Sequence, residues 1–266
     1  MKLALFLFPI ALLAQVQTQA EIRGKKVIDD AITALGGEKF LNVEDRLESG
    51  RAYSFYNSQL TGLSIAKVYT RYMSVATGKT GQDLGLRERQ AFGKDEYQSV
   101  LFREDGAWEI TFRGAKPLEK ERLERYHDTT LRNFLYIARQ RLKEPGMLFE
   151  SRGTDVVENV PVEVVEITDA QNRTVTVYFH PTTKLPVQQR WVFRDEKTKE
   201  RDEEITRFSR YRDIGGGVQW PHQILRERNG DKIFEMFSES VRVNQDLTDA
   251  VFAKESPQAD RKPKKK

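Results

Sequence analysis

The sequence predicts an α+β fold in a single domain. We expect a strongly curved antiparallel sheet, a half-open barrel of about ten strands with helices covering its concave face. Three observations lead to this prediction. Helical apolar spacing occurs only near the start and in the middle of the chain, and the other regular segments alternate as strands do. The connections between the strands are short and rich in turn residues, which favours antiparallel neighbours. The two apolar helix faces need a surface to pack on, and a curled sheet supplies one.

The first part of the mature chain is expected to form one helix followed by strands. Apolar residues recur at three- and four-residue spacing over residues 24–35, which predicts an amphipathic helix that ends at Gly36-Gly37. Residues 38–43 are expected to add a short helical turn. Aromatic and branched residues between turn glycines then predict strands at residues 51–56, 63–73, 84–92, 97–103 and 107–112. Asp105-Gly106 between the last two is typical of a hairpin turn.

A second helical region is expected between two groups of strands. Pro117 fits the first turn of a largely charged helical segment, and Thr129 or Thr130 fits the cap of a further helix. The apolar face of that helix would carry Leu131, Phe134, Leu135, Ala138 and Leu142. From residue 147 onward every regular segment reads as a strand: residues 174–179 alternate most clearly, and 188–193, 204–211, 222–227 and 232–243 follow.

Residues 1–20 have the pattern of a secretory signal peptide. Lys2 precedes a short apolar stretch, and Thr18 and Ala20 are small residues at the positions that a cleavage site after Ala20 requires. The apolar stretch is shorter than the roughly 20 residues of a membrane-spanning helix, although an uncleaved anchor is an alternative. We therefore expect a periplasmic protein, exported across the inner membrane, with residues 21–255 as its single domain.

Charge and cysteine content exclude several classes of function. The chain of 266 residues has a net charge of +4 and no cysteine, so a disulfide scaffold, a thiolate metal site and an N-terminal lipid anchor are excluded. Between Glu21 and Glu255 there are 38 basic and 39 acidic residues, so the domain is not basic and no nucleic acid is expected as a partner. Residues 256–266 hold five basic residues and are expected to be a disordered tail, either solubilising or facing anionic lipid.

Several motifs in the second half of the chain resemble one known family. His180-Pro181-Thr182-Thr183-Lys184-Leu185-Pro186 follows a strand, and Val218-Gln219-Trp220-Pro221 and Val243-Asn244-Gln245-Asp246-Leu247 occur further on. In this order, after a signal peptide and a helix ending in Leu35-Gly36-Gly37, they are similar to the periplasmic outer-membrane lipoprotein-sorting carriers and their envelope-stress regulator relatives. The resemblance covers most of the mature chain, and its motifs are structural.

The resemblance implies a half-open β-barrel with an apolar cavity that holds the acyl chains of a lipoprotein or a lipid. Burying one methylene gains about 0.8 kcal/mol, so a cavity that takes a dozen carbons would bind usefully. Nine residues are candidates for lining it: Val175, Val177, Phe179, Trp191, Phe193, Leu131, Phe134, Leu135 and Ala138. An ordinary filled core would explain the same residues, so both interpretations stay open.

No pattern in the sequence predicts catalysis, a metal or a cofactor. His127, His180 and His222 have no metal-binding spacing. The acidic groups, Asp202-Glu203-Glu204, Asp195-Glu196 and Glu119 with Glu121 and Glu124, are interleaved with basic residues and are expected to be solvated. An exported hydrolase is disfavoured because no nucleophile and base stand in a known arrangement. The leading hypothesis is therefore a monomeric, non-enzymatic, chaperone-like carrier, and the alternative is an envelope protein-interaction or stress-sensing module that binds a membrane protein.

Overall fold

A computed structural model describes residues 17–74, 83–194 and 199–255 of the chain. The elements before the middle of the chain are α1 (Gln19–Leu35), α2 (Glu38–Leu41), β1 (Asp45–Tyr56), β2 (Gln59–Tyr72), β3 (Leu86–Phe92), β4 (Gln98–Arg103), β5 (Gly106–Thr111) and β6 (Gly114–Pro117). A helical segment follows, with α3 (Lys120–Leu131), α4 (Phe134–Tyr136) and the π-helical turn η1 (Ile137–Arg141). The remaining elements are β7 (Leu148–Val157), β8 (Val160–Thr168), β9 (Thr174–Phe179), β10 (Pro186–Arg194), β11 (Arg201–Asp213), β12 (Gln219–Arg228), β13 (Asp231–Val243) and the 3₁₀ turn η2 (Asp249–Phe252).

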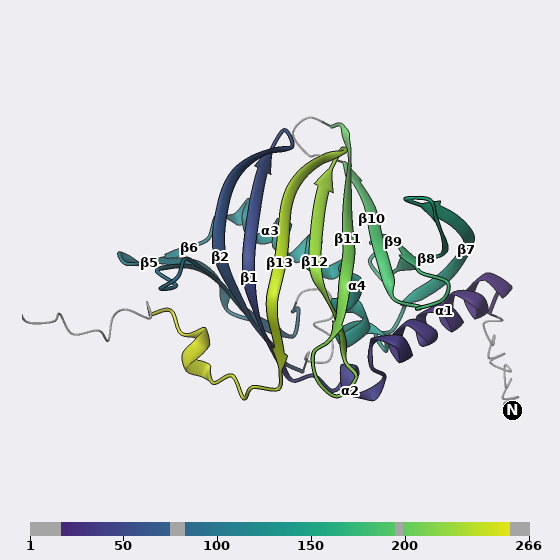
Figure 1. Ribbon diagram of the computed structural model, residues 1–266, viewed down its shortest axis with the longest axis horizontal. Helices are drawn as coiled ribbons and strands as arrows, with labels where there is room; N and C mark the ends of the chain where they lie inside the picture. The colour runs from purple at the N-terminus through teal and green to yellow at the C-terminus, as the bar shows by residue number, and fades with distance from the viewer. Residues whose placement is uncertain (1–16, 75–82, 195–198, 256–266) are drawn as a thin grey trace, which may run out of the picture.

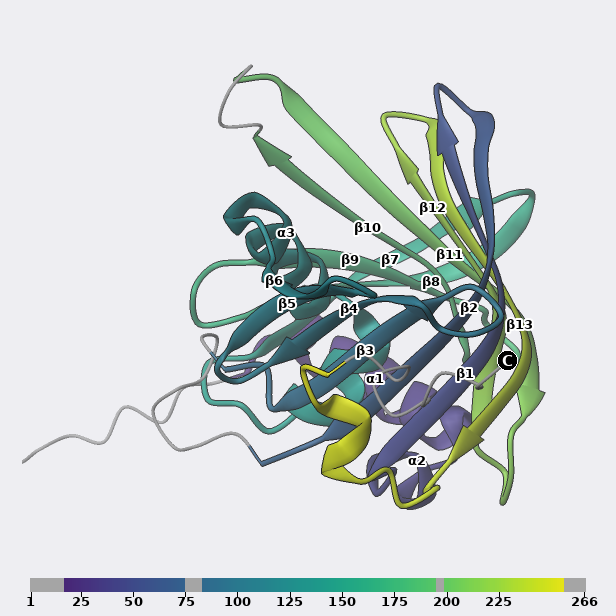
Figure 2. The same ribbon diagram turned by 90° about the vertical axis from the view of Figure 1, so that its left-hand side faces the viewer.

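The strands form one antiparallel sheet that does not close on itself. Its order is β6-β5-β4-β3-β2-β1-β13-β12-β11-β10-β9-β8-β7, so sequence neighbours pair everywhere except where β1 meets β13. The two edges, β6 and β7, are consecutive strands, and the helical segment from α3 to η1 connects them. The sheet bends strongly, and α3 lies on the inner side of the bend (Figures 1 and 2). The predicted α+β class and the unclosed antiparallel sheet are confirmed.

The sheet has thirteen strands rather than about ten, and one of the additional strands shows why. β6 has the sequence Gly-Ala-Lys-Pro, which carries no apolar alternation, and all four of its residues are exposed. As an edge strand it tolerates Pro117, because the missing N–H has no ladder partner to lose. Pro117 therefore ends a strand instead of opening a helix, and α3 begins three residues later at Lys120.

The helical segment also differs in detail from the prediction. Thr129 and Thr130 lie inside α3, and the cap of the next helix is Asn133, whose side-chain oxygen accepts a hydrogen bond from the backbone N–H of Tyr136. Sequence alone does not separate these possibilities, because Thr and Asn are both good caps and the two threonines lie only three and four residues before Asn133.

The main core lies between the helices and the second half of the sheet. One face of α1 packs on β7 and β8, and Gly24 allows the close approach, since a Cβ there would lie 2.3 Å from the backbone oxygen of Phe149. Leu35, Phe134 and Phe179 are fully buried in this core. The rings of Phe134 and Phe179 meet edge to face with centroids 5.0 Å apart, so α4 is fixed against β9.

A buried ion cluster fixes the end of the helical segment. Arg141 is 3% exposed, pairs with Glu144 and Asp169, and donates a hydrogen bond of 3.1 Å to the backbone oxygen of Leu131 at the end of α3. Because Arg141 is the last residue of η1 and its guanidinium contacts Asp169, directly after β8, and Leu131, the last residue of α3, it holds the ends of these three elements together.

The predicted signal peptide is described only at its end, and the predicted tail is not described. The capping box of α1 joins Thr18 to Glu21 and so includes residues on both sides of the cleavage point predicted after Ala20. The tail predicted at residues 256–266 and residues 1–16 of the signal peptide lie outside the described residues. The signal peptide therefore remains a prediction.

Candidate functional site

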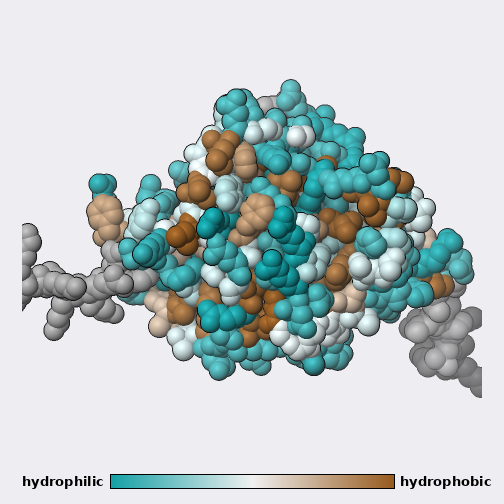
Figure 3. Space-filling view, viewed as in Figure 1, coloured by the Kyte–Doolittle hydropathy of each residue, from teal (hydrophilic) through white to brown (hydrophobic). Residues whose placement is uncertain are grey.

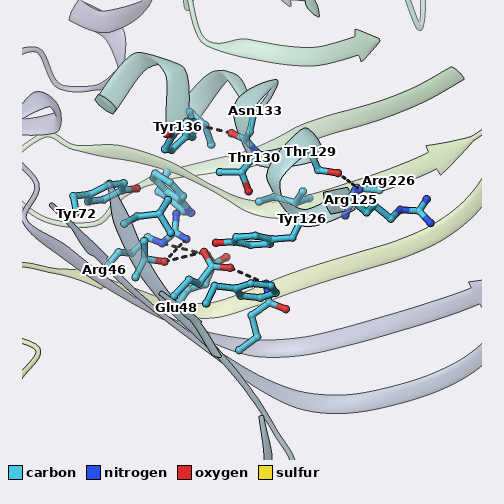
Figure 4. A pocket seen from close by; sticks show the side chains of 18 of the residues that line it. Arg46, Glu48, Tyr72, Arg125, Tyr126, Thr129, Thr130, Asn133, Tyr136 and Arg226 are labelled. Atoms are coloured by element: carbon cyan, nitrogen blue, oxygen red, sulfur yellow. Dashed lines mark hydrogen bonds and ion pairs between the residues drawn. The ribbon is translucent and has the colours of Figure 1, made fainter. Parts of the chain in front are cut away.

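A cavity of about 460 Å³ lies between α3 and the inner face of the sheet (Figure 4). This volume falls in the range of small-molecule sites. Side chains from β1, β2, β3, β4 and β12 form one wall, and α3 and α4 form the other. The lining residues are Arg46, Glu48, Thr70, Tyr72, Leu86, Glu88, Gln90, Phe102, Arg122, Arg125, Tyr126, Thr129, Thr130, Asn133, Leu135, Tyr136, Trp220, Ile224 and Arg226.

The inner end of the cavity is charged. The Arg46 guanidinium stacks over the Trp220 ring at 4.2 Å, donates to the Thr70 hydroxyl at 3.1 Å, and has its Nε 3.7 Å from a Glu48 carboxylate oxygen. Glu88 accepts hydrogen bonds from Thr70 at 3.3 Å and from Gln90 at 2.7 Å. Burial raises the pKa of Glu88, since the ionised carboxylate is less well solvated there.

Several buried donors around this cavity have no hydrogen-bond partner. Of the six buried side-chain polar atoms without a partner in the described part of the chain, four belong to residues that line it. They are Arg46 Nε, the Tyr126 hydroxyl, Trp220 Nε1 and Arg226 Nε. Unpaired buried polar groups are rare in proteins, and their concentration here indicates a place where a ligand or water completes the hydrogen bonding.

An ion cluster around Glu204 connects α3 to the sheet at the outer end of the cavity. Glu204 is 2% exposed and accepts from Arg125 of α3 at 3.0 Å, from Arg226 of β12 at 3.0 Å and from Nε of Arg228 at 3.2 Å. Leu131 is the one buried residue of α3. Leu123 and Tyr126 are partly buried against the sheet residues Val100, Phe102 and Ala107. This helix is therefore held by charge pairs and by partly buried contacts, and its apolar anchoring is weaker than that of α1.

An apolar strip continues from the cavity along the inner face of the sheet. It consists of the buried Ala52, Ala66 and Met236, with Phe92 and Phe234 packed against them. Phe92 lies two residues beyond the cavity-lining Gln90 on β3, and it pairs with Ala66 on β2, so the strip begins where the cavity lining ends. The site as a whole thus combines a charged inner end with an apolar approach.

The nine residues predicted from the sequence to line a lipid cavity lie in the main core. Eight are buried and Phe193 is partly buried, and all nine belong to one cluster with α1. Leu135 alone among them also lines the cavity under α3. Trp191 and Phe193 stack with ring centroids 4.7 Å apart, and the Arg132 guanidinium lies 4.5 Å from the Trp191 ring centroid. Their role in binding acyl chains remains a prediction.

The histidines and acidic groups of the sequence lie in separate places. His180 accepts backbone N–H bonds of 3.2 Å from Thr182 and Thr183 in a turn, whereas the Nδ1 atom of the buried His222 lies 3.1 Å from the backbone oxygen of Trp220. Within residues 17–74, 83–194 and 199–255, no group of three or more His, Asp or Glu side chains could hold a metal ion. Glu204 is buried rather than solvated, because it faces the inner side of β11 where three arginines meet it. Asp195 and Glu196 lie outside the described residues.

The residues at the charged inner end were not predicted from the sequence. Arg46 and Glu48 precede the first predicted strand, and Glu88 lies between Arg87 and Arg89 on a strand with charges on both faces. Only the register of β1, β2 and β3 brings Arg46, Thr70 and Glu88 into one row across the sheet.

Comparison of the sequence with known families and with curated proteins finds no match. No model of a known protein family matches the sequence, and no curated protein matches it. In the described residues, no helix is both long and apolar enough to span a membrane.

Solved structures, by contrast, share the fold over most of the chain. A DUF1329 family protein from Desulfovibrio piger is 16% identical, with a TM-score of 0.56 over 86% of this chain and 97% of its own. A domain assigned to outer membrane lipoprotein sorting, from Vibrio parahaemolyticus, is 14% identical, with a TM-score of 0.56 over 88% of this chain and 97% of its own. A LolA superfamily protein from Nitrosomonas europaea is 11% identical, with a TM-score of 0.53 over 87% and 97%. The chain therefore has the fold of the lipoprotein-sorting and LolA superfamily proteins, as the motifs of its second half predicted.

Proposed function

We propose that the protein is a non-enzymatic carrier of the bacterial cell envelope that binds an amphiphile, the acyl-chain end of a lipoprotein or a lipid, between α3 and the inner face of the sheet. The observation that carries the proposal is the cavity of about 460 Å³ with its apolar strip. The fold shared with a lipoprotein-sorting domain and with a LolA superfamily protein supports it. Export by a signal peptide, and hence a periplasmic location, is part of the same proposal.

The lining of the site favours an amphiphile over a plain hydrocarbon. Leu86, Leu135 and Ile224 offer apolar wall, but the inner end holds Arg46, Glu48 and Glu88. Burying a hydrocarbon against such charges without replacing their water is unfavourable, because each charge loses solvation and gains nothing. A ligand with a polar group at the inner end and a chain along the strip satisfies both parts.

The weak apolar anchoring of α3 fits a protein that releases what it binds. A carrier needs an element that separates from the rest of the fold without unfolding it, and such elements have few buried apolar contacts. α3 has one buried residue, and Arg125, which pairs it with Glu204, has a side chain that is 48% exposed.

Mass spectrometry of the protein purified from a Gram-negative host tests this proposal. We expect co-purified acyl lipid in the wild type and its loss in Ala66→Phe, which places a ring on the apolar strip. Ile65→Phe is the matched control, since Ile65 is the neighbouring residue on β2, is 48% exposed and faces outward. If Ala66→Phe does not fold, Ser64→Phe on the same face replaces it. Protein that is consistently free of lipid, together with failure to bind added fatty acid, would refute the carrier function.

A second candidate function rests on the outer face of the sheet. Leu63 and Ile65 of β2 are 59% and 48% exposed, and next to them the rings of Tyr53 and Phe237 meet edge to face with centroids 5.8 Å apart. Figure 3 shows apolar patches among polar ones on this face. A protein-interaction or stress-sensing module would use such a surface to bind the periplasmic segment of a membrane protein. Stoichiometric capture of such a segment, lost in Leu63→Ser but kept in Ala66→Phe, would favour this candidate.

A further inference from the structure

Two cavities meet at a single pair of aromatic rings. Besides the cavity described above, a second one of about 450 Å³ lies under the other side of α3, between α3 and the start of β3 and the turn from β4 to β5. The two cavities share three lining residues, Leu86, Phe102 and Tyr126. Since Phe102 comes from the sheet and Tyr126 from the helix, the contact between their rings is where the two walls touch.

The geometry of this contact makes it a weak barrier. The rings of Phe102 and Tyr126 are nearly parallel, at 8°, and their centroids are 3.5 Å apart, so the rings overlap almost completely. Aromatic pairs prefer offset or edge-to-face arrangements, because full overlap places one negative ring face against another. The pair is therefore less stable than an offset pair of the same area.

The position of Tyr126 also leaves it free to move. Its buried hydroxyl has no hydrogen-bond partner on the sheet within the described residues, and the one side chain that acts on it by hydrogen bonding, Thr130, belongs to α3 as well, so no hydrogen bond ties the ring to the sheet. The ring belongs to α3, in which Leu131 alone is buried, whereas Phe102 lies in a strand paired on both sides. When the two rings separate, we therefore expect Tyr126 to move and Phe102 to stay in place.

We propose that Tyr126 and Phe102 form a partition between the two cavities, and that Tyr126 determines the length of the acyl chain that the protein accepts. This inference rests on the proposed carrier function. With the ring in place, a chain has the first cavity and the strip; with the ring displaced, the chain extends under α3 into the second cavity. Leu84, Leu86 and Leu123 supply an apolar wall there, along which the chain would lie, whereas Asp83, Arg103, Glu104 and His127 line the other parts of that cavity.

The test compares binding of octanoate, laurate, palmitate and stearate by titration calorimetry to the purified protein. In the wild type we expect affinity to rise with chain length and then to level off. In Tyr126→Ala the affinity should continue to rise to longer chains before it levels off. Each additional methylene that the variant accommodates should raise the affinity by at most about fourfold, which corresponds to about 0.8 kcal/mol. Tyr126→Phe keeps the ring and should reproduce the wild-type profile.

A crystal structure of Tyr126→Ala separates this inference from the proposed function. One continuous cavity in the variant supports the partition, whether or not fatty acids bind. Collapse of Phe102 or α3 into the space of the lost ring would overturn it, and so would a chain-length profile unchanged from the wild type. If Tyr126→Ala does not fold, Phe102→Ala removes the partition from the sheet side and is subject to the same two readouts. Wild-type protein that binds none of the four acids, in contrast, contradicts the carrier function and leaves the structural outcome to decide the partition.

Discussion

Replacing Glu204 by glutamine should affect the stability of the whole protein and the opening of α3 by different amounts. Removing one partner of a buried ion pair costs about 3–5 kcal/mol, because the remaining charge is left without compensation. The arginine side chains around Glu204 are between 26% and 48% exposed, so water partly replaces the lost carboxylate. We therefore expect Glu204→Gln to lower the free energy of unfolding by about 2–3 kcal/mol, below the fully buried value.

Glu204→Gln should lower the free energy of opening of α3 by less than it lowers the free energy of unfolding of the whole protein. Arg226 and Arg228 lie on the sheet beside Glu204, so only the pair with Arg125 breaks when the helix separates. A half-exposed ion pair is worth at most about 1 kcal/mol, so amide exchange in α3 should accelerate by no more than about fivefold.

Urea unfolding measures the first quantity, and hydrogen–deuterium exchange of the amides of residues 120–131 measures the second. Arg125→Gln is the matched control, since it removes the same contact from the helix side and leaves Glu204 with its two sheet partners. It should accelerate exchange in α3 as much as Glu204→Gln does, while lowering global stability by less than about 1 kcal/mol. Equal global destabilisation by the two variants, or unchanged exchange in α3, would refute this account of how the helix is held.

Three further predictions concern residues that do not line the cavity of the site. Arg141→Met leaves the buried Glu144 without its cation and leaves Asp169 with Arg173 as its only basic partner within the described residues, so it should lower the free energy of unfolding in urea by about 3–5 kcal/mol; a loss below about 1 kcal/mol would contradict the role assigned to this cluster. Arg87 lies outside the site, and its hydrogen bond lowers the pKa of Glu104 to about 2 from 4.5. Because the folded-state pKa is the lower one, the stabilisation is present above pH 4.5 and is lost as the pH falls towards about 2. Nuclear magnetic resonance titration of Arg87→Gln should return the Glu104 pKa towards 4.5, and an unshifted value would show that another group is responsible. Gly24→Ala should destabilise the protein by about 1–3 kcal/mol in thermal unfolding, although alanine is the better helix former, because its Cβ would lie 2.3 Å from the Phe149 oxygen; a stabilised variant would mean that α1 shifts freely.

The fold class was predictable because it depends on apolar periodicity. The helix expected over residues 24–35 lies within α1, and the Asp105-Gly106 turn joins β4 to β5. These features depend on residues close together in sequence. β6 was not predicted, because an exposed edge strand of four residues has no alternation of apolar and polar residues.

Most residues of the candidate site could not be predicted from the sequence, because the site depends on the register of several strands. In β3, Arg87 and Arg89 face outward to Glu104 and to the C-terminal segment, while Glu88 faces the cavity. A strand with charges on both faces does not show which face is buried. The nominated core residues were visible as apolar alternation, but alternation does not distinguish a packed core from the wall of a cavity.

The pairing of β1 with β13 has a consequence for folding. Every other strand pair joins neighbours in sequence, so β1 to β6 and β7 to β13 can each form by successive hairpins. The β1–β13 pair instead joins residues about two hundred positions apart, such as Arg46 and Val243. Closing so long a loop is entropically unfavourable until other contacts exist, so this seam should be the slow step of folding. Until the seam forms, β1 and β13 are both open edges, and this is the stage at which the chain is most exposed to pairing with another molecule.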